Sequence, residues 1–101
     1  MVKWADYCIF AVRYNSERTH IERLRGAKDL GDKLGDAKLW SREQVVAGLE
    51  KGYEFVTVIK NNTGRYDKGQ KVELIEVDGT KYMRTDKNSI ASDNLENLEE
   101  F

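Results

Sequence analysis

The pair Asp78-Gly79 constrains the fold of this chain more than any other feature of its sequence. It separates two runs of β-prone residues, 72–77 and 80–84. A type I′ turn needs two successive residues with positive φ, and an Asp-Gly pair suits both positions. The sequence therefore predicts a β-hairpin that places two antiparallel strands in the last third of the chain.

Length and charge limit what the rest of the chain can do. The 101 residues are enough for one core, so we expect a single domain spanning 1–101. Lys and Arg number 17 against 18 Asp and Glu, which removes a global attraction to nucleic acid. We therefore expect no sequence-specific nucleic-acid binding.

Cysteine usage and apolar patterning point to the cytoplasm. The single Cys8 excludes an intrachain disulfide and a cysteine-based zinc cage. The first residues lack the apolar core of a signal peptide, and no apolar stretch approaches the roughly 18 residues of a membrane span. We expect a cytoplasmic protein with no membrane partner.

The first third of the chain is expected to be strand, strand and loop. Residues 5–14 are apolar on both alternating faces, which is typical of a strand covered on both sides. Residues 20–27 form a weaker strand, because Ile21 and Leu24 break strict alternation and suggest a bulge. Residues 28–39 are expected to be a loop.

The clearest helix start follows this loop. Ser41 and Gln44 have the spacing of a capping box, and Trp40 can pack on Val45 as a hydrophobic staple. Gly52 suits the C′ position that ends a helix. The sequence therefore predicts a helix of about three turns that must be held by packing on a sheet.

One more strand, at 53–59, completes a ββαβββ order with the hairpin. The predicted fold class is α+β, with a small, mainly antiparallel sheet of about five strands and one short helix packed on it. The polar segment and tail at 86–101 should dock on the body, because Leu95, Leu98 and Phe101 would otherwise expose their apolar area.

Arginines at strand ends are the main candidates for binding. Arg13, Arg23 and Arg25 lie on the first two strands, and Arg84 ends the last one. If these ends are neighbours, the guanidinium groups converge on a phosphate or carboxylate, with a tyrosine stacking beside it. Alternatively, each arginine pairs with Asp or Glu across the sheet. The full predicted ligand rim is Arg13, Tyr14, Arg23, Arg25, Tyr82, Arg84, Thr85, Asp86, Asp93 and Asn94.

No catalytic, metal-ligating or cofactor-binding residue is predicted. His20 is the only imidazole, and its sequence neighbours offer no recognisable triad. Asp29, Asp32 and Asp36 lack the spacing of a calcium loop, and no glycine-rich phosphate loop is present. We expect His20 to be a surface or strand-end residue.

Five segments of the chain occur together in a known family. They are 11–14 (AVRY), 20–21 (HI), 40–45 (WSREQV), 81–86 (KYMRTD) and 93–98 (DNLENL). In these segments the chain resembles a family of short bacterial, archaeal and phage proteins known as a domain of unknown function, number thirty-eight ninety-two. The resemblance implies a compact α+β domain and no assigned activity.

The sequence is compatible with three functions. The leading one is a non-enzymatic binding module that holds, and in one version sequesters, a small anionic or nucleotide-like ligand. The first alternative is a protein–protein adaptor or inhibitor without a small ligand, favoured by the balanced charge and by Trp4, Tyr66 and Phe101. The second is a small hydrolase using His20 with Asp86 or Asp93.

We also expect a homo-oligomer, and a dimer in the simplest case. Two strands with both faces apolar need more cover than one short helix provides.

Overall fold

The computed structural model describes residues 5–31, 34–64, 66–85, 92–95 and 98–101. The described part is mainly sheet with one short helix, which confirms the predicted α+β class. In chain order its elements are β1 (Tyr7–Tyr14), β2 (Ile21–Lys28), β3 (Lys38–Ser41), α1 (Arg42–Glu50), β4 (Phe55–Lys60), β5 (Tyr66–Lys71), β6 (Glu73–Val77), β7 (Thr80–Arg84) and β8 (Glu99–Glu100).

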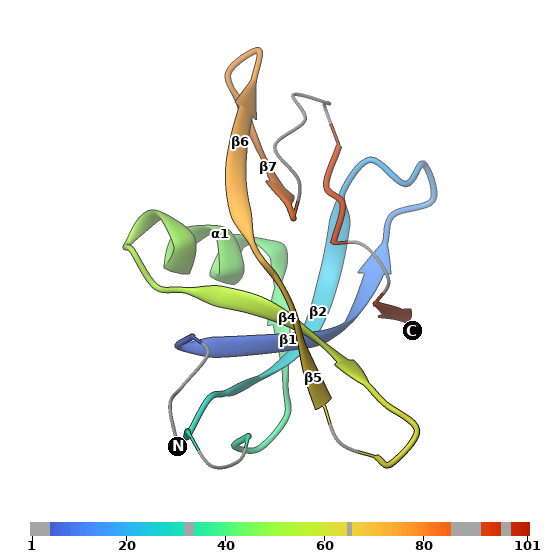
Figure 1. Ribbon diagram of the computed structural model, residues 1–101. Coiled ribbons are helices and arrows are strands. Elements are labelled where there is room, and N and C mark those ends of the chain that lie inside the picture. Colours follow the sequence, from blue (N-terminus) through green and yellow to red (C-terminus); the bar gives the residue numbers. More distant parts are fainter. Residues whose placement is uncertain (1–4, 32–33, 65, 86–91, 96–97) are drawn as a thin grey trace.

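The main sheet is mixed, with the strand order β3-β2-β1-β4-β5 and with β8 also paired to β1. Strands β4 and β8 run parallel to β1, whereas the β1–β2, β2–β3 and β4–β5 pairs are antiparallel. Hairpin β6–β7 forms a separate two-stranded sheet that rises above the main one in Figure 1. The order ββαβββ is therefore incomplete, because β3, β5 and β8 were not predicted.

Two local sequence signals form as predicted. At the hairpin turn, Asp78 and Gly79 have φ values of 51° and 81°, and Val77 pairs with Thr80 across it. At the start of α1, the Gln44 N–H donates to Ser41 Oγ at 3.2 Å and the Ser41 N–H donates to Gln44 Oε1 at 2.9 Å. The helix ends at the C-cap Lys51, followed by Gly52 with a φ of 95°.

Because β1 contains a β-bulge, it contributes side chains to two apolar clusters. Its pairing with β2 shifts between Ile9 and Ala11, so that Ile9 and Val12 both reach the main core. Cys8 belongs to a second cluster on the opposite face, and Phe10 packs against that cluster. Both faces of β1 are thus covered within one chain, which removes the reason given for an oligomer. The oligomer itself stays a prediction.

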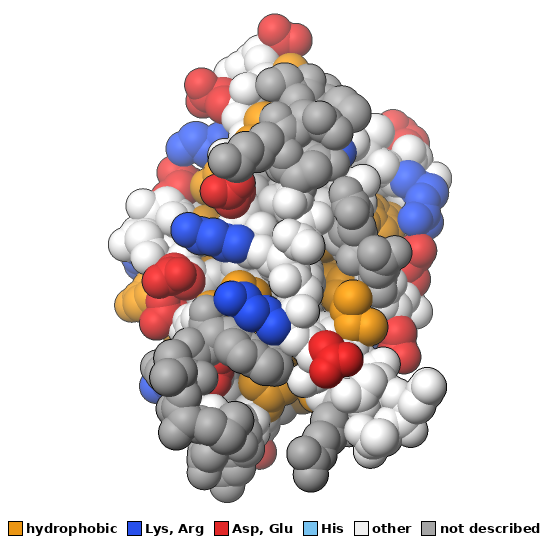
Figure 2. Space-filling model, viewed as in Figure 1, with side chains coloured by type: hydrophobic (Ala, Val, Ile, Leu, Met, Phe, Trp, Pro, Cys, Tyr) orange, Lys and Arg blue, Asp and Glu red, His pale blue; other side chains and the backbone are white. Residues whose placement is uncertain are grey.

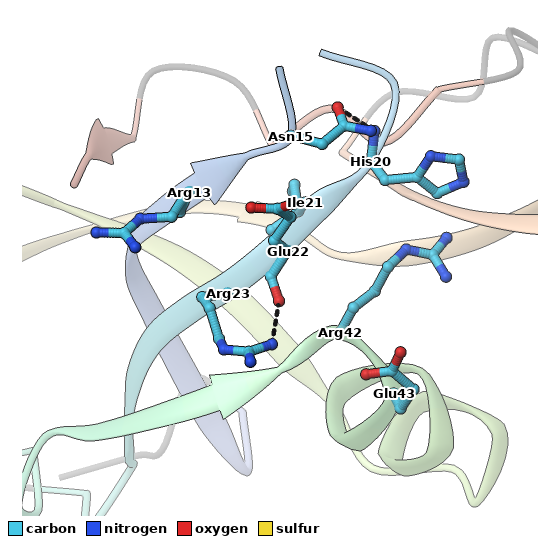
Figure 3. Close-up of a pocket in the computed structure, with 8 residues that line it drawn as sticks. All are labelled: Arg13, Asn15, His20, Ile21, Glu22, Arg23, Arg42 and Glu43. Carbon is cyan, nitrogen blue, oxygen red and sulfur yellow. Dashed lines mark hydrogen bonds between the residues drawn. The ribbon is translucent and has the colours of Figure 1, made fainter. Parts of the chain in front are cut away.

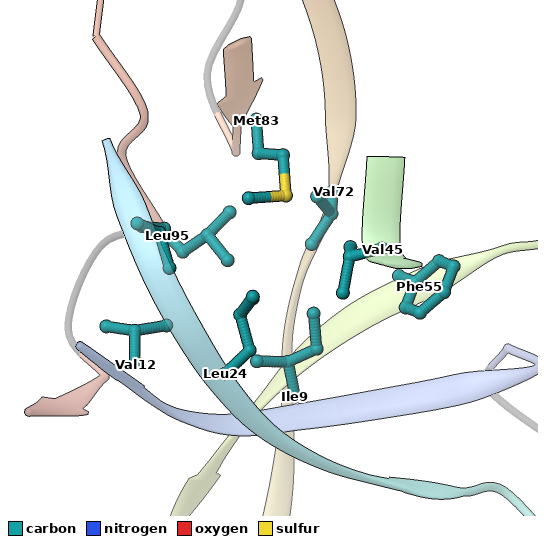
Figure 4. Close-up of a cluster of buried hydrophobic side chains, with 9 residues drawn as sticks. Ile9, Val12, Leu24, Val45, Phe55, Val72, Met83 and Leu95 are labelled. Atoms are coloured by element: carbon teal, nitrogen blue, oxygen red, sulfur yellow. The ribbon is translucent and has the colours of Figure 1, made fainter. Parts of the chain in front are cut away.

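The main core joins the sheet, the helix, the hairpin and the segment after the hairpin (Figure 4). Val45 is the one fully buried residue of α1, and Met83 comes from β7. Leu95 is 1% exposed and lies in the same core. The buried members are Ile9, Val12, Ile21, Leu24, Val45, Phe55, Val72, Met83 and Leu95.

The described parts of the 86–101 segment make several contacts with the body, two of which involve the core and the main sheet. Leu95 enters the core, and β8 pairs with β1 through Ala11–Glu99 and Val12–Glu100. Residues 86–91 and 96–97 lie outside the described part of the chain. In that described part, no helix has the length and apolar character needed to cross a membrane.

Candidate functional site

A polar hollow of about 530 Å³ lies where β1 ends, β2 begins and α1 begins (Figure 3). Figure 3 shows Arg13 and Arg23 toward one side of the hollow and His20 and Arg42 toward the other. Its lining carries both signs of charge and one imidazole. The lining residues are Arg13, Asn15, His20, Ile21, Glu22, Arg23, Arg42 and Glu43.

Two of the predicted arginines line this hollow. Arg13 and Arg23 are direct partners in the antiparallel β1–β2 pairing, and both are exposed. Arg13 Nε donates to the carbonyl of Phe101 at 2.8 Å, and Arg23 Nη1 donates to the carbonyl of Glu22 at 3.0 Å. Neither forms an ion pair with a carboxylate of the described residues. Like charges directly opposite each other destabilise a sheet, so an anion bound beside this pair would reduce their repulsion.

Arg25 shares the face of Arg23, since it lies two residues further along the same strand. Its guanidinium lies over the ring of Phe101, 4.2 Å from the centroid, and that of Arg13 lies 5.1 Å from the same centroid. Three of the four predicted arginines therefore gather on one face of β1 and β2.

Arg84 does not join them. It is 2% exposed, and its Nη1 donates to the carbonyl and the hydroxyl of Ser92 at 2.9 and 3.2 Å. This arginine anchors the segment after the hairpin and does not line the hollow.

Asp93 is a buried structural carboxylate. Its side chain is fully buried and accepts hydrogen bonds from Arg42 Nε at 2.7 Å and Arg42 Nη2 at 3.1 Å. The main-chain N–H groups of Ile21 and Met83 each donate to it at 2.8 Å. Both oxygens are thus occupied by protein donors, and the hydrogen bond to Asp93 raises the pKa of Arg42. The pair joins β2, β7 and the start of α1.

Both predicted stacking tyrosines already have partners. The guanidinium of Arg18 covers the ring of Tyr14 at 4.5 Å, and burial raises the pKa of the Tyr14 hydroxyl. Tyr82 is 8% exposed, and its ring centroid lies 5.4 Å from that of His20. The aromatic ring that the hollow offers to a ligand is therefore the half-buried imidazole of His20.

Asn94 and Thr85, two further predicted rim residues, lie beside the hairpin and do not line the hollow. Asn94 continues the pairing with β7, its N–H donating to the carbonyl of Met83 at 2.8 Å. Thr85 has a buried hydroxyl without a hydrogen-bond partner among the described residues. Asp86 and Trp4 lie outside the described residues.

No group of three or more His, Cys, Asp or Glu side chains that could hold a metal ion occurs in the described ranges. Cys8 is fully buried, and this burial, followed by the nearby charge of Asp29, raises the pKa of its thiol to about 12. A thiol with this pKa is a poor nucleophile near neutral pH.

Sequence reasoning missed Arg42, the one lining residue that also forms a partly buried ion pair. The sequence does contain one signal that points to Arg42. Arg42 is the first residue of α1, where the helix dipole disfavours a positive charge. An arginine at this position indicates a nearby carboxylate, and Asp93 supplies it.

Comparison with known proteins identifies a family for this chain. The family described as "Protein of unknown function (DUF3892)" matches residues 8–99. Neither a curated protein nor a solved structure matches the chain.

Proposed function

The chain belongs to this family of proteins of unknown function, and we propose that it is a non-enzymatic binding module for a small anionic ligand. The observation that carries the proposal is the direct pairing of Arg13 with Arg23 at a hollow, without a carboxylate partner among the described residues. An anion between the two guanidinium groups would relieve their repulsion and accept paired hydrogen bonds from each fork.

The size and surroundings of the hollow suit a small ligand. Its volume of about 530 Å³ falls within the usual range for small-molecule sites. On the face shown in Figure 2, basic and acidic side chains are interspersed, so attraction to an anion must come from a local arrangement. The Arg13–Arg23 pair is such an arrangement.

A nucleotide-like ligand fits this hollow in one orientation. Its phosphate would lie at Arg13 and Arg23, and its base would stack on the imidazole of His20. Binding without turnover would sequester the ligand.

The contacts do not favour a hydrolase. A catalytic His20 would need a base or a carboxylate to orient it, but its Nδ1 lies 3.1 Å from the hydroxyl of Thr19. The carboxylate of Asp93 is engaged by Arg42 and by two main-chain N–H groups. These contacts support binding without chemistry.

One observation favours the adaptor function as a second candidate. Leu39 on the edge strand β3 is 61% exposed, and Leu30 is 46% exposed. Both line a second hollow of about 580 Å³, together with Tyr7 and Trp40. Exposed apolar residues around a hollow are typical of protein contact sites. Leu39→Asp would abolish adaptor binding and leave anion binding at the first hollow unchanged.

Isothermal titration with inorganic phosphate, pyrophosphate and adenosine monophosphate tests the anion site. We expect Arg23→Gln to weaken binding at least about tenfold, because one charged fork is lost. Lys71→Gln removes the same charge from an exposed position on β5 and should leave affinity unchanged. No binding by the wild type, or equal losses in both variants, would overturn the proposal.

A further inference from the structure

Phe101 contacts two of the three arginines on the β1–β2 face. The guanidinium groups of Arg13 and Arg25 lie 5.1 and 4.2 Å from the centroid of its ring. Its carbonyl also accepts the hydrogen bond from Arg13 Nε at 2.8 Å. Its own N–H donates to the carbonyl of Val12 at 3.1 Å, which ties the residue to β1.

These contacts restrict two long side chains. An exposed arginine samples many rotamers, and ordering it on binding costs free energy. The negative face of an aromatic ring attracts a guanidinium group and limits that sampling before a ligand arrives. The ring of Phe101 does this for Arg13 and Arg25 together.

The strand register places Arg23, the third arginine of this face, beside Arg13 and Arg25. Arg23 lies directly opposite Arg13, and Arg25 is opposite Ala11, so Arg13 and Arg25 are diagonal neighbours across the β1–β2 pair. The forks of Arg13 and Arg23 would suffice for a single phosphate. Arg25 does not line the hollow itself, and its fork would be left for a second anionic group attached to the first.

We infer that Phe101 is a positioning residue and that the three arginines select a ligand with two linked phosphoryl groups over a single phosphate. This inference rests on the proposed anion-binding function. Phe101 acts through Arg13 and Arg25, and the selected class includes pyrophosphate and nucleoside diphosphates.

Titration calorimetry with inorganic pyrophosphate and inorganic phosphate at equal ionic strength tests the selectivity. We expect the wild type to prefer pyrophosphate about tenfold or more. Phe101→Leu removes the π face and should reduce the preference to about a third of its value, whereas Phe101→Tyr keeps the ring and should preserve it. If the wild type binds neither anion, the proposed function fails. If it binds both and Phe101→Leu keeps the full preference, the inference fails and the function stands.

Arg25→Gln gives a second test that leaves β8 and its contact with β1 in place. It should remove most of the pyrophosphate preference and change phosphate affinity by less than about twofold. Equal losses for both anions would contradict a separate role for Arg25.

A spectroscopic test needs no ligand. In the wild type, the side-chain Nε–Hε signals of Arg13 and Arg25 should show ring-current shifts. Phe101→Leu should abolish these shifts and Phe101→Tyr should retain them. Unshifted signals in the wild type would overturn the positioning role.

Discussion

Replacing Asp93 by Ala should be among the most destabilising single substitutions in this chain. The carboxylate accepts two hydrogen bonds from Arg42 and one each from the N–H groups of Ile21 and Met83. Removing one partner of a buried ion pair costs about 3–5 kcal/mol. Each buried N–H left without a partner costs about 1–3 kcal/mol, although these losses overlap.

We expect Asp93→Ala to lower the free energy of unfolding by about 4 kcal/mol, because 20% of the Arg42 side chain stays accessible and water can reach part of the site. This is a large share of the roughly 5–15 kcal/mol that holds a typical domain folded. Urea unfolding followed by far-ultraviolet circular dichroism measures the change.

Asp36→Ala is the matched control, since Asp36 is exposed in the loop before β3 and should change stability by less than about 0.5 kcal/mol. In a double-mutant cycle with Arg42→Met, the double variant should lose less stability than the sum of the single losses. A loss below about 1 kcal/mol for Asp93→Ala, or strict additivity with Arg42→Met, would refute the assigned role of this pair.

Three further substitutions or reactions test local features of the fold. Ser41→Ala should lower the free energy of unfolding by about 1 kcal/mol in the same urea assay, and an unchanged value would contradict the capping box. Cys8 should stay unreactive toward a disulfide reagent at pH 8 in the folded protein, because burial raises its pKa to about 12; rapid labelling would show an accessible thiol. Gly69→Ala should destabilise by about 1–3 kcal/mol, because a Cβ there would overlap Thr57 Oγ1 and lie 2.8 Å from the Thr57 carbonyl oxygen. Unchanged thermal unfolding of this variant would argue against the β4–β5 register.

The parts of the fold that depend on local chemistry could be predicted from the sequence. Asp78-Gly79 imposes its turn through backbone preference, and Ser41 with Gln44 closes a capping box within four residues. Both signals act over a short stretch of chain. The turn and the capping box therefore form independently of the tertiary contacts made by the rest of the chain.

The strands that were missed depend on partners distant in sequence. Tyr66–Lys71, the β5 segment, is polar and contains Gly69, so its own pattern does not indicate a strand. It forms one because β4 offers an edge for antiparallel pairing. The two residues of β8 likewise owe their conformation to the neighbouring β1.

The difference between local signals and pairing of distant segments also explains which of the predicted site residues lie together. Arg13 and Arg23 are cross-strand neighbours because β1 and β2 are consecutive and antiparallel, a relation that the sequence suggests. Arg84 lies apart because hairpin β6–β7 forms its own sheet, which no local pattern reveals. Since Arg84 is buried against Ser92, Arg84→Lys should lower stability and leave anion affinity unchanged.

The most direct test of the central claim is a titration of the protein with inorganic pyrophosphate, followed through the side-chain Nε–Hε NMR signals of all its arginines. The signals of Arg13 and Arg23 should shift together and reach saturation, and that of the buried Arg84, which does not line the hollow, should move least. Small, unsaturable shifts spread over every exposed arginine would contradict a built anion site at the β1–β2 hollow.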